Sequence, residues 1–336
     1  MDGTLEKMYV APSPHIRDKH TTQRIMADVL IALLPAAAAA VYFYGASALL
    51  LMAASVAAAV LAEYVWQKAN RQRVTVSDLS AAVTGLLLAF NMPASAPVWM
   101  PVIGAVFAII IVKQLFGGLG HNFINPALAA RGALMASWPS HMTSFVMPGA
   151  DAVSSATPLG MIKEGAGTFA DVTARFSLTD VLTGRIPGCL GEVSAVLLLA
   201  GGIYLIARKV IQPRIPVAML GSMIVMLWIF GGEGGLFSAS AYAVLYQVAC
   251  GGAVLGAVFM ATDYATTPVT PVGQWIFGAG AGVLAVIIRL LGTYPEGVSY
   301  AILLMNVAAP LIEKLTRPTP FGVQKPAGKK AGGSAA

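Results

Sequence analysis

The sequence is poor in the residues that bind metal centres. It contains 2 cysteines, Cys189 and Cys250, which stand far apart with no Cys-x-x-Cys spacing. A four-thiolate iron–sulfur cluster held within this chain is therefore excluded. It has 4 histidines, at positions 15, 20, 121 and 141, and no two of them face each other on predicted helices. This argues against a haem held by a histidine pair.

The motifs of soluble nucleotide-binding domains are missing as well. The run Gly117-Gly118-Leu119-Gly120 follows a predicted membrane helix and not a strand, so it lacks the βαβ context of a dinucleotide fingerprint. No Walker motif occurs anywhere in the sequence. Chemistry on a soluble nucleotide must therefore belong to a partner protein.

Charged residues are scarce, at 11% of the chain, whereas 57% of the residues are hydrophobic. The mean hydropathy is +0.75, far from the balance of a soluble domain. Because a membrane crossing needs roughly 20 apolar residues, we expect an all-α integral membrane protein with about ten transmembrane helices. The expected spans are residues 24–44, 46–66, 77–93, 98–116, 121–138, 190–208, 215–231, 240–261, 272–291 and 298–315.

The lysines and arginines predict which side of the membrane each loop faces. Most of them flank the spans in positions that fall on one side of a ten-span chain, and the positive-inside rule makes that side cytoplasmic. The pI of about 9.3 thus reflects topology and not nucleic-acid binding. The expected parts are a cytoplasmic segment 1–23, a five-helix half 24–138, an outer segment 139–189, a second five-helix half 190–315 and a disordered cytoplasmic tail 316–336.

Each five-helix half carries a polar interruption that contains proline, at residues 116–126 and 262–271. Irregular backbone at membrane depth survives only where protein or a cavity satisfies its polar groups. Paired interruptions therefore predict an inverted repeat with a site near the interface of the repeats. Asp263, His121 and Asn122 lie in these interruptions and are candidates for ion-path or ligand contacts. For His121 alone, the sequence favours a helix-packing or interfacial histidine over a ligand contact.

The outer segment contains the stretch Asp151-Ala152-Val153-Ser154-Ser155-Ala156-Thr157-Pro158-Leu159. Pro158 biases Thr157 toward an extended backbone, which predicts an accessible hydroxyl. Asp151 either binds a group during modification or caps a turn. An ordinary exposed loop would have a similar composition. The full pattern, however, resembles the acceptor site at which a flavin transferase esterifies FMN through its phosphate to a threonine.

The chain as a whole resembles the RnfD/NqrB family of membrane flavoprotein subunits. The resemblance covers about residues 9–317 and rests on a combination of motifs. These are Ser13-Pro14-His15-Ile16-Arg17, Lys113-Gln114-Leu115-Phe116 with the glycine run after it, Asn125-Pro126-Ala127, Ser154-Ser155-Ala156-Thr157-Pro158-Leu159 and Phe259-Met260-Ala261-Thr262-Asp263. The resemblance implies that Thr157 carries covalent FMN, with Asp151, Ser154, Ser155 and Ala156 as the rest of the acceptor motif.

The resemblance further implies a subunit of an Rnf-type ion-translocating ferredoxin:NAD oxidoreductase in the inner membrane of a prokaryote. Such a subunit holds no metal and no complete catalytic site of its own. The implied partners are RnfA, RnfB, RnfC, RnfE and RnfG, a flavin transferase acting on the outer face, the transported Na⁺ or H⁺, and membrane lipid, with no nucleic acid. Similarity to NqrB also allows a noncovalent riboflavin, for which the sequence identifies no pocket.

Two other classes of protein stay open from the residues alone. A secondary transporter or channel without redox function would have the same spans, repeat and broken helices, but would have no use for an FMN acceptor. A structural scaffold within a membrane complex would need neither a cofactor nor buried polar interruptions. Thr157 is the residue that distinguishes these classes.

Overall fold

The computed structural model describes residues 21–148, 155–165, 168–232, 236–292 and 294–318. Throughout these residues the regular structure is helical, and the β-type pairing is one isolated antiparallel bridge between Pro93 and Cys189. The expected all-α class is confirmed. Most of the predicted N-terminal segment and tail lies outside the described residues.

The helices form three consecutive groups along the chain. The first group is α1 (Thr22–Tyr44), α2 (Ala46–Ala69), η1 (Val76–Asp78), α3 (Ser80–Phe90), α4 (Trp99–Val106), the π-helix η2 (Phe107–Gln114) and α5 (Pro126–Ser137). The second group is α6 (Pro139–Met142), α7 (Pro158–Glu164), α8 (Phe169–Arg175), α9 (Leu178–Thr183) and η3 (Leu190–Glu192). The third group is α10 (Ala195–Ala207), α11 (Arg214–Phe230), α12 (Ala241–Ala249), α13 (Ala253–Leu255), the π-helix η4 (Gly256–Met260), α14 (Pro271–Leu291) and α15 (Val298–Thr316).

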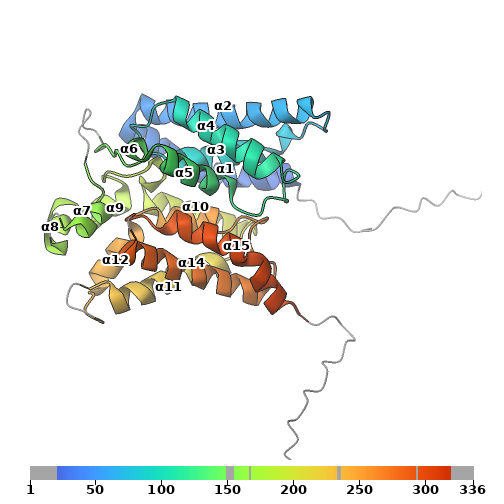
Figure 1. The fold of residues 1–336 in the computed structure, drawn as a ribbon. Coiled ribbons are helices and arrows are strands. Elements are labelled where there is room, and N and C mark those ends of the chain that lie inside the picture. The colour runs from blue at the N-terminus through green and yellow to red at the C-terminus, as the bar shows by residue number, and fades with distance from the viewer. Residues whose placement is uncertain (1–20, 149–154, 166–167, 233–235, 293, 319–336) are drawn as a thin grey trace, which may run out of the picture.

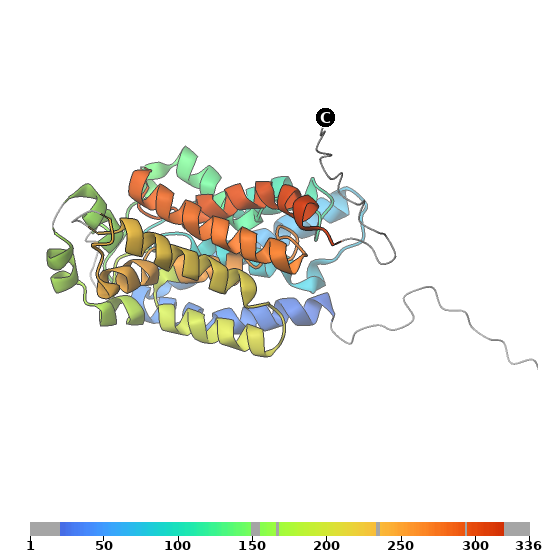
Figure 2. The same ribbon diagram turned by 90° about the horizontal axis from the view of Figure 1, so that it is seen from below.

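The bundle has two distinct ends (Figure 1). Helix α1 begins and α15 ends at the same end, which we call the terminus end, whereas α7, α8 and α9 lie at the opposite end, which we call the acceptor end. Figure 2 shows the same separation from below, with the green α7–α9 group beyond one end of the long helices. Helices α7, α8 and α9 therefore lie at the opposite end of the bundle from the start of α1 and the end of α15.

Four helices are long and apolar enough to cross a membrane: α1, α2, α14 and α15. Helix α12 and residues Ala253–Met260 would together make a fifth crossing, bent by 67° at the break between them. Between 28% and 44% of the apolar window of each long helix is buried. Most of this apolar surface therefore faces outward, as expected where lipid replaces water. Shorter apolar helices are α3, α4 with η2, α10 and α11.

The predicted spans 77–93 and 121–138 are shorter as helices than expected. Leu79 has a left-handed backbone with φ of 65°, and α3 begins only at Ser80. The Asn125 side chain caps α5 by accepting from Ala127 N at 3.0 Å, so this helix starts at Pro126. Both segments thus combine a half-length helix with irregular chain.

Small residues set the spacing between helices. The Ser55 hydroxyl of α2 donates to the Gly85 carbonyl of α3 at 2.6 Å, and a Cβ on Gly85 would stand 2.8 Å from the Ser55 carbonyl. A Cβ on Gly282 of α14 would stand 2.3 Å from the Met219 carbonyl of α11. Close backbone approach through small residues is how membrane helices associate without a hydrophobic driving force.

Candidate functional site

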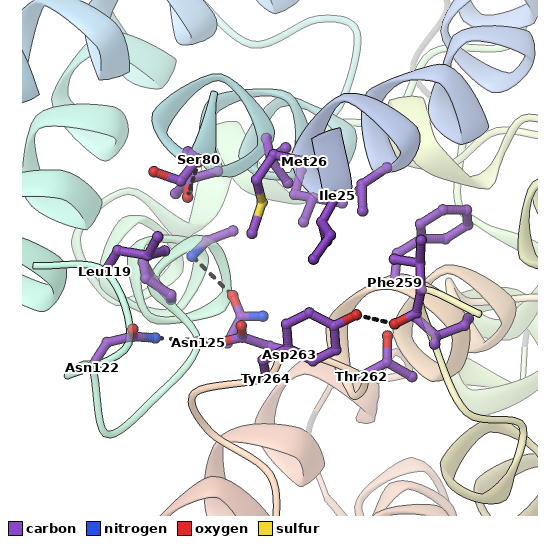
Figure 3. Close-up of a pocket in the computed structure, with 18 of the residues that line it drawn as sticks. Ile25, Met26, Ser80, Leu119, Asn122, Asn125, Phe259, Thr262, Asp263 and Tyr264 are labelled. Atoms are coloured by element: carbon purple, nitrogen blue, oxygen red, sulfur yellow. Dashed lines mark hydrogen bonds between the residues drawn. The ribbon is translucent and has the colours of Figure 1, made fainter. Parts of the chain in front are cut away.

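A cavity lies between the first and third helix groups (Figure 3). Its apolar wall includes Met26 of α1, Leu87 of α3 and Phe259 of η4. Its polar groups come from Ser80, Thr84, Lys113, Asn122, Asn125, Thr262, Asp263 and Tyr264. The two polar interruptions seen in the sequence therefore meet at one place, although they lie far apart along the chain.

Asp263 is the acidic group of the cavity. Its Oδ2 accepts a hydrogen bond from Asn122 Nδ2 at 3.4 Å and another from Thr266 Oγ1 at 3.2 Å. Figure 3 shows the Asn122 amide pointing at Asp263 across the cavity rim. The candidates Asp263 and Asn122 are thus brought together. His121 does not line the cavity and is exposed, so the structure separates it from the other two.

Lys113 is the basic group of the cavity, and the π-helix η2 positions it. Its ammonium donates to Glu63 Oε1 at 2.9 Å and to Ser80 Oγ at 2.6 Å. The Lys113 and Glu63 side chains are both buried, with relative exposures of 3% and 1%. Gln114 Nε2 donates to the same Glu63 oxygen at 2.7 Å. This buried pair survives because neighbouring donors share its carboxylate.

Asn125 joins the two helical halves at the cavity wall. Its side-chain oxygen caps α5, while its Nδ2 donates to the Met260 carbonyl at the end of η4 at 3.2 Å. Its backbone N–H donates to Asn306 Oδ1 of α15 at 3.1 Å, and Asn306 Nδ2 donates to the Thr266 carbonyl at 3.2 Å. The Asn306 side chain of α15 therefore satisfies a backbone N–H of the first irregular segment and a backbone carbonyl of the second.

Thr157 directly precedes α7 at the acceptor end. Its backbone is extended, with φ of −65° and ψ of 153°, as predicted from Pro158. Its hydroxyl oxygen accepts from Gly160 N at 3.1 Å and so acts as the N-cap of α7. The residue is only 5% exposed. The expectation of an accessible hydroxyl is therefore wrong for this conformation, because the cap turns the hydroxyl inward.

Helix α7 rests on the ends of α12 and α14. Leu159 is buried in a small core that it shares with Phe176, Tyr246 and Cys250. Lys163 Nζ donates to the Arg289 carbonyl at 3.0 Å and to the Tyr294 carbonyl at 3.3 Å. Partial burial and the charge of Arg289 lower the pKa of Lys163. Lys163 is thus a structural donor here.

The structure places only part of the predicted acceptor motif, and it shows other site residues that were not predicted. Asp151 and Ser154 lie outside the described residues, and Ser155 and Ala156 stand directly before Thr157. Sequence reasoning missed Lys113 and Asn125 as site residues, because it named both only as parts of family motifs. A lysine and an asparagine beside a glycine-rich or proline-containing break are the signals that could have found them.

Comparison with known proteins gives one consistent result. The sequence pattern of the NQR2, RnfD, RnfE family matches residues 9–322. The chain is 51% identical over 319 residues to the D subunit of the Na⁺-translocating ferredoxin:NAD⁺ oxidoreductase complex of Acetobacterium woodii, covering 94% of this chain and 96% of that protein. It is 43% identical over 324 residues to the D subunit of the proton-translocating ferredoxin:NAD⁺ oxidoreductase complex of Clostridium ljungdahlii, covering 94% and 96%. It is 36% identical over 357 residues to the D subunit of an ion-translocating oxidoreductase complex of Escherichia coli, covering 94% and 99%.

Proposed function

The chain belongs to the NQR2, RnfD, RnfE family, and we propose on that premise that it is a membrane subunit of an ion-translocating ferredoxin:NAD⁺ oxidoreductase complex. The observation that carries the proposal is similarity over nearly the whole chain to proteins named as the D subunit of such complexes. Partner subunits, by resemblance RnfA, RnfB, RnfC, RnfE and RnfG, supply the ferredoxin and NAD sites. This chain carries electrons and couples them to transport of Na⁺ or H⁺.

We infer that the electron carrier is FMN esterified to Thr157. The acceptor pattern and the extended backbone before Pro158 support this assignment. Thr157 also lies at the opposite end of the bundle from both described chain ends (Figure 1). Because the hydroxyl is buried as an N-cap, the first turn of α7 has to open while the transferase acts. The protein's share is placement and electrostatics, and the cofactor supplies the redox chemistry.

The test is in-gel ultraviolet fluorescence of the denatured chain, expressed with an active flavin transferase. A fluorescent wild-type band and a dark Thr157→Val band are expected. Thr183→Val is the matched control, because it removes an exposed threonine hydroxyl from the same outer segment and should leave the band fluorescent. A dark wild-type band, with the transferase active on a second substrate, would refute covalent FMN and favour the transporter.

We further propose that the helices make ten crossings in two five-helix halves with inverted topology. The ten are the four long helices, the bent α12–η4 unit, half-length α3 and α5, and the shorter apolar helices α4 with η2, α10 and α11. The cytoplasmic face is then the terminus end, and Thr157 is outside. A cysteine introduced at exposed Thr183 should react with an impermeant thiol reagent in whole cells, and one at exposed Gln72 should not. The reverse pattern would invert the topology.

The cavity lined by Lys113 and Asp263 supports a ligand role in either class of function. A noncovalent riboflavin fits its mainly apolar wall with a few polar groups, which is typical of cofactor sites. The same cavity is the observation that favours a transporter or channel. Flavin released by denaturing the Thr157→Val protein decides between them. About one noncovalent flavin per chain supports the cofactor site, and flavin-free protein that still transports ions supports the alternative.

The flavin on Thr157 is expected to drive coupling. With the flavin outside and the donor and acceptor inside, electrons cross the membrane twice, and this crossing drives alternating access of an ion path in this chain or its neighbours. A Thr157→Val complex should therefore lose electron-driven ion transport. A flavin-free variant complex that still pumped ions with normal coupling would sink this idea.

A further inference from the structure

A second group of buried ionisable side chains lies at the acceptor end, away from the cavity. It consists of Cys189 and Glu192 ahead of α10, Glu296 ahead of α15, Arg131 of α5 and Arg289 of α14, and we call it the Glu192–Glu296 cluster. All are buried except Glu192, which is half-buried with its Oε1 buried. The Cys189 sulfur and one carboxylate oxygen from each glutamate lie within 4.8 Å of one another. Neither the acceptor motif nor the family resemblance assigned these residues a role.

Among the described residues, one carboxylate oxygen of Glu296 accepts a hydrogen bond and the other accepts none. Its Oε2 accepts from Arg131 Nη2 at 2.6 Å, and both residues are 7% exposed. Arg131 Nη1 is shared between Asn91 Oδ1 at 3.0 Å and Ser299 Oγ at 2.9 Å. Within the described residues, Glu296 Oε1 is buried and accepts no hydrogen bond. None of these hydrogen bonds from Arg131 therefore reaches Glu296 Oε1.

Glu192 has no cation bonded to it in the part of the chain that the structure describes. Among these residues its carboxylate forms no ion pair, and its Oε1 is buried with no hydrogen-bond donor. A second positive charge in the cluster is Arg289, but Arg289 Nη1 donates to the Gln247 carbonyl at 2.5 Å and Nη2 donates to the Cys250 carbonyl at 3.4 Å. Arg289 thus caps the end of α12 and does not bond to Glu192.

Two carboxylates this close cannot both stay ionised in a buried site. Their charges repel strongly at low dielectric, and a buried carboxylate without a partner takes up a proton to avoid the desolvation cost. Paired carboxyls elsewhere share one proton for the same reason. We propose that Glu192 and Glu296 together bind one exchangeable proton in the folded protein, held on the carboxylate oxygens that have no other donor.

The neighbours of the pair leave a proton as the occupant that fits. The groups that face it are Arg131, Arg289, Tyr44 of α1, Cys189 and Cys250 of α12. Both guanidinium groups already lie beside the carboxylates, so a divalent cation would add twice the positive charge that a proton adds. A hard cation also needs about six oxygen ligands, and this site offers two carboxylates and a thiol. A proton supplies one O–H donor and lets the guanidinium groups stay in place.

The pair lies beneath the segment that carries Thr157. Lys163 of α7 donates to the carbonyl of Arg289, and a Cβ on Gly251 would meet both Leu159 of α7 and the Arg289 guanidinium. Glu192 itself follows the bridge of Cys189 to Pro93, at the seam between the two helical halves. A proton held here sits where the outer segment and both halves touch.

The first test is infrared spectroscopy of the full chain in its complex at neutral pH. The wild type should show the C=O band of a protonated carboxylic acid that Glu192→Gln abolishes, while Glu164→Gln, at an exposed acid of α7, should leave it unchanged. No such band, or the same band in Glu192→Gln and Glu296→Gln as in the wild type, would overturn the proposal. So would Zn²⁺ binding at one per chain that Cys189→Ser abolishes.

A second measurement keeps the proposal testable if a variant folds poorly. A proton that the folded chain holds and the unfolded chain releases makes folding less favourable as pH rises above about 4.3. The unfolding equilibrium constant of the wild type should then rise about tenfold per pH unit relative to Glu192→Gln. Parallel pH profiles for the two proteins would contradict a shared proton. These outcomes do not depend on a flavin at Thr157.

Discussion

Two groups of buried ionic side chains in the described chain differ in how their carboxylates are bonded. At the cavity, Glu63 Oε1 accepts from Lys113 at 2.9 Å, from Gln114 at 2.7 Å and from Gln67 at 3.4 Å, so one acid faces one base and two amides. At the acceptor end, two acids face the guanidinium groups of Arg131 and Arg289, and only Arg131 bonds to one of them, Glu296. Each group leaves a buried carboxylate oxygen without a donor, Glu63 Oε2 in the first and Glu296 Oε1 in the second. The difference is that the acid of the first group has its own cation, whereas in the second group Glu192 has no cation bonded to it among the described residues.

Breaking the pair of Lys113 and Glu63 should have the largest effect. Lys113→Met leaves Glu63 buried with no cation, and removal of one partner of a buried pair costs about 3–5 kcal/mol. The measurement is the free energy of unfolding in detergent. The control is the double variant Lys113→Met with Glu63→Leu, which should recover most of the loss because no buried charge remains. A double variant no more stable than Lys113→Met would contradict this.

Breaking the second group should cost less and depend on pH. Arg131→Met removes bonds to Glu296, Asn91 and Ser299, but Glu296 can then bind a proton in place of the guanidinium. We expect a loss of about 2–3 kcal/mol below pH 5 that grows as pH rises. Thermal unfolding from pH 5 to pH 8 measures this. A loss that did not change with pH would contradict proton binding by Glu296 in the variant.

Much of the architecture could be predicted from the sequence, and the ionic groups could not. Hydrophobic length placed α1, α2, α14 and α15 close to their observed bounds, and the proline-containing breaks located both walls of the cavity. The partners of charged residues depend on contacts such as Arg131 with Glu296, which stand 165 residues apart. Hydropathy has no information about such pairs. Pro158 predicted the extended backbone of Thr157 correctly but not the burial of its hydroxyl, because the N-cap is a property of the folded turn.

Asn125 links α5 to the end of η4 without a charge, and its loss should reduce stability less than the loss of either ionic group. Asn125→Ala removes the N-cap of α5 and the donor to Met260, which predicts a loss of about 1–2 kcal/mol. Unfolding in detergent measures it, and the loss should be the same at every pH from 5 to 8. A pH-dependent loss in Asn125→Ala would link it to an ionic group.

The smallest effect is expected in the exposed outer segment. Hydrogen bonds from the Thr168 hydroxyl and backbone lower the pKa of Asp171, which closes the capping box of α8. A lowered carboxyl pKa stabilises the fold above the unfolded value of about 3.9 and loses that contribution as pH falls through the folded value. The protection of α8 amides against exchange, relative to the unfolded chain, should therefore fall below pH 4. Asp171→Asn should remove this acid dependence. Unchanged acid sensitivity in the variant would assign it elsewhere.

The bridge between Pro93 and Cys189 has a consequence for how the chain is made. It forms with the hydrogen bond from Leu190 N to the Met92 carbonyl, directly after half-length α3. During synthesis the helices from α1 to α5 are made before residue 189, so the end of α3 and the Arg131 guanidinium then lack partners that come later in the chain. An insertion intermediate with these groups exposed should be held by the insertion machinery, or degraded, until the second half arrives. Truncation after the first half should consequently yield a short-lived product and not a stable five-helix protein.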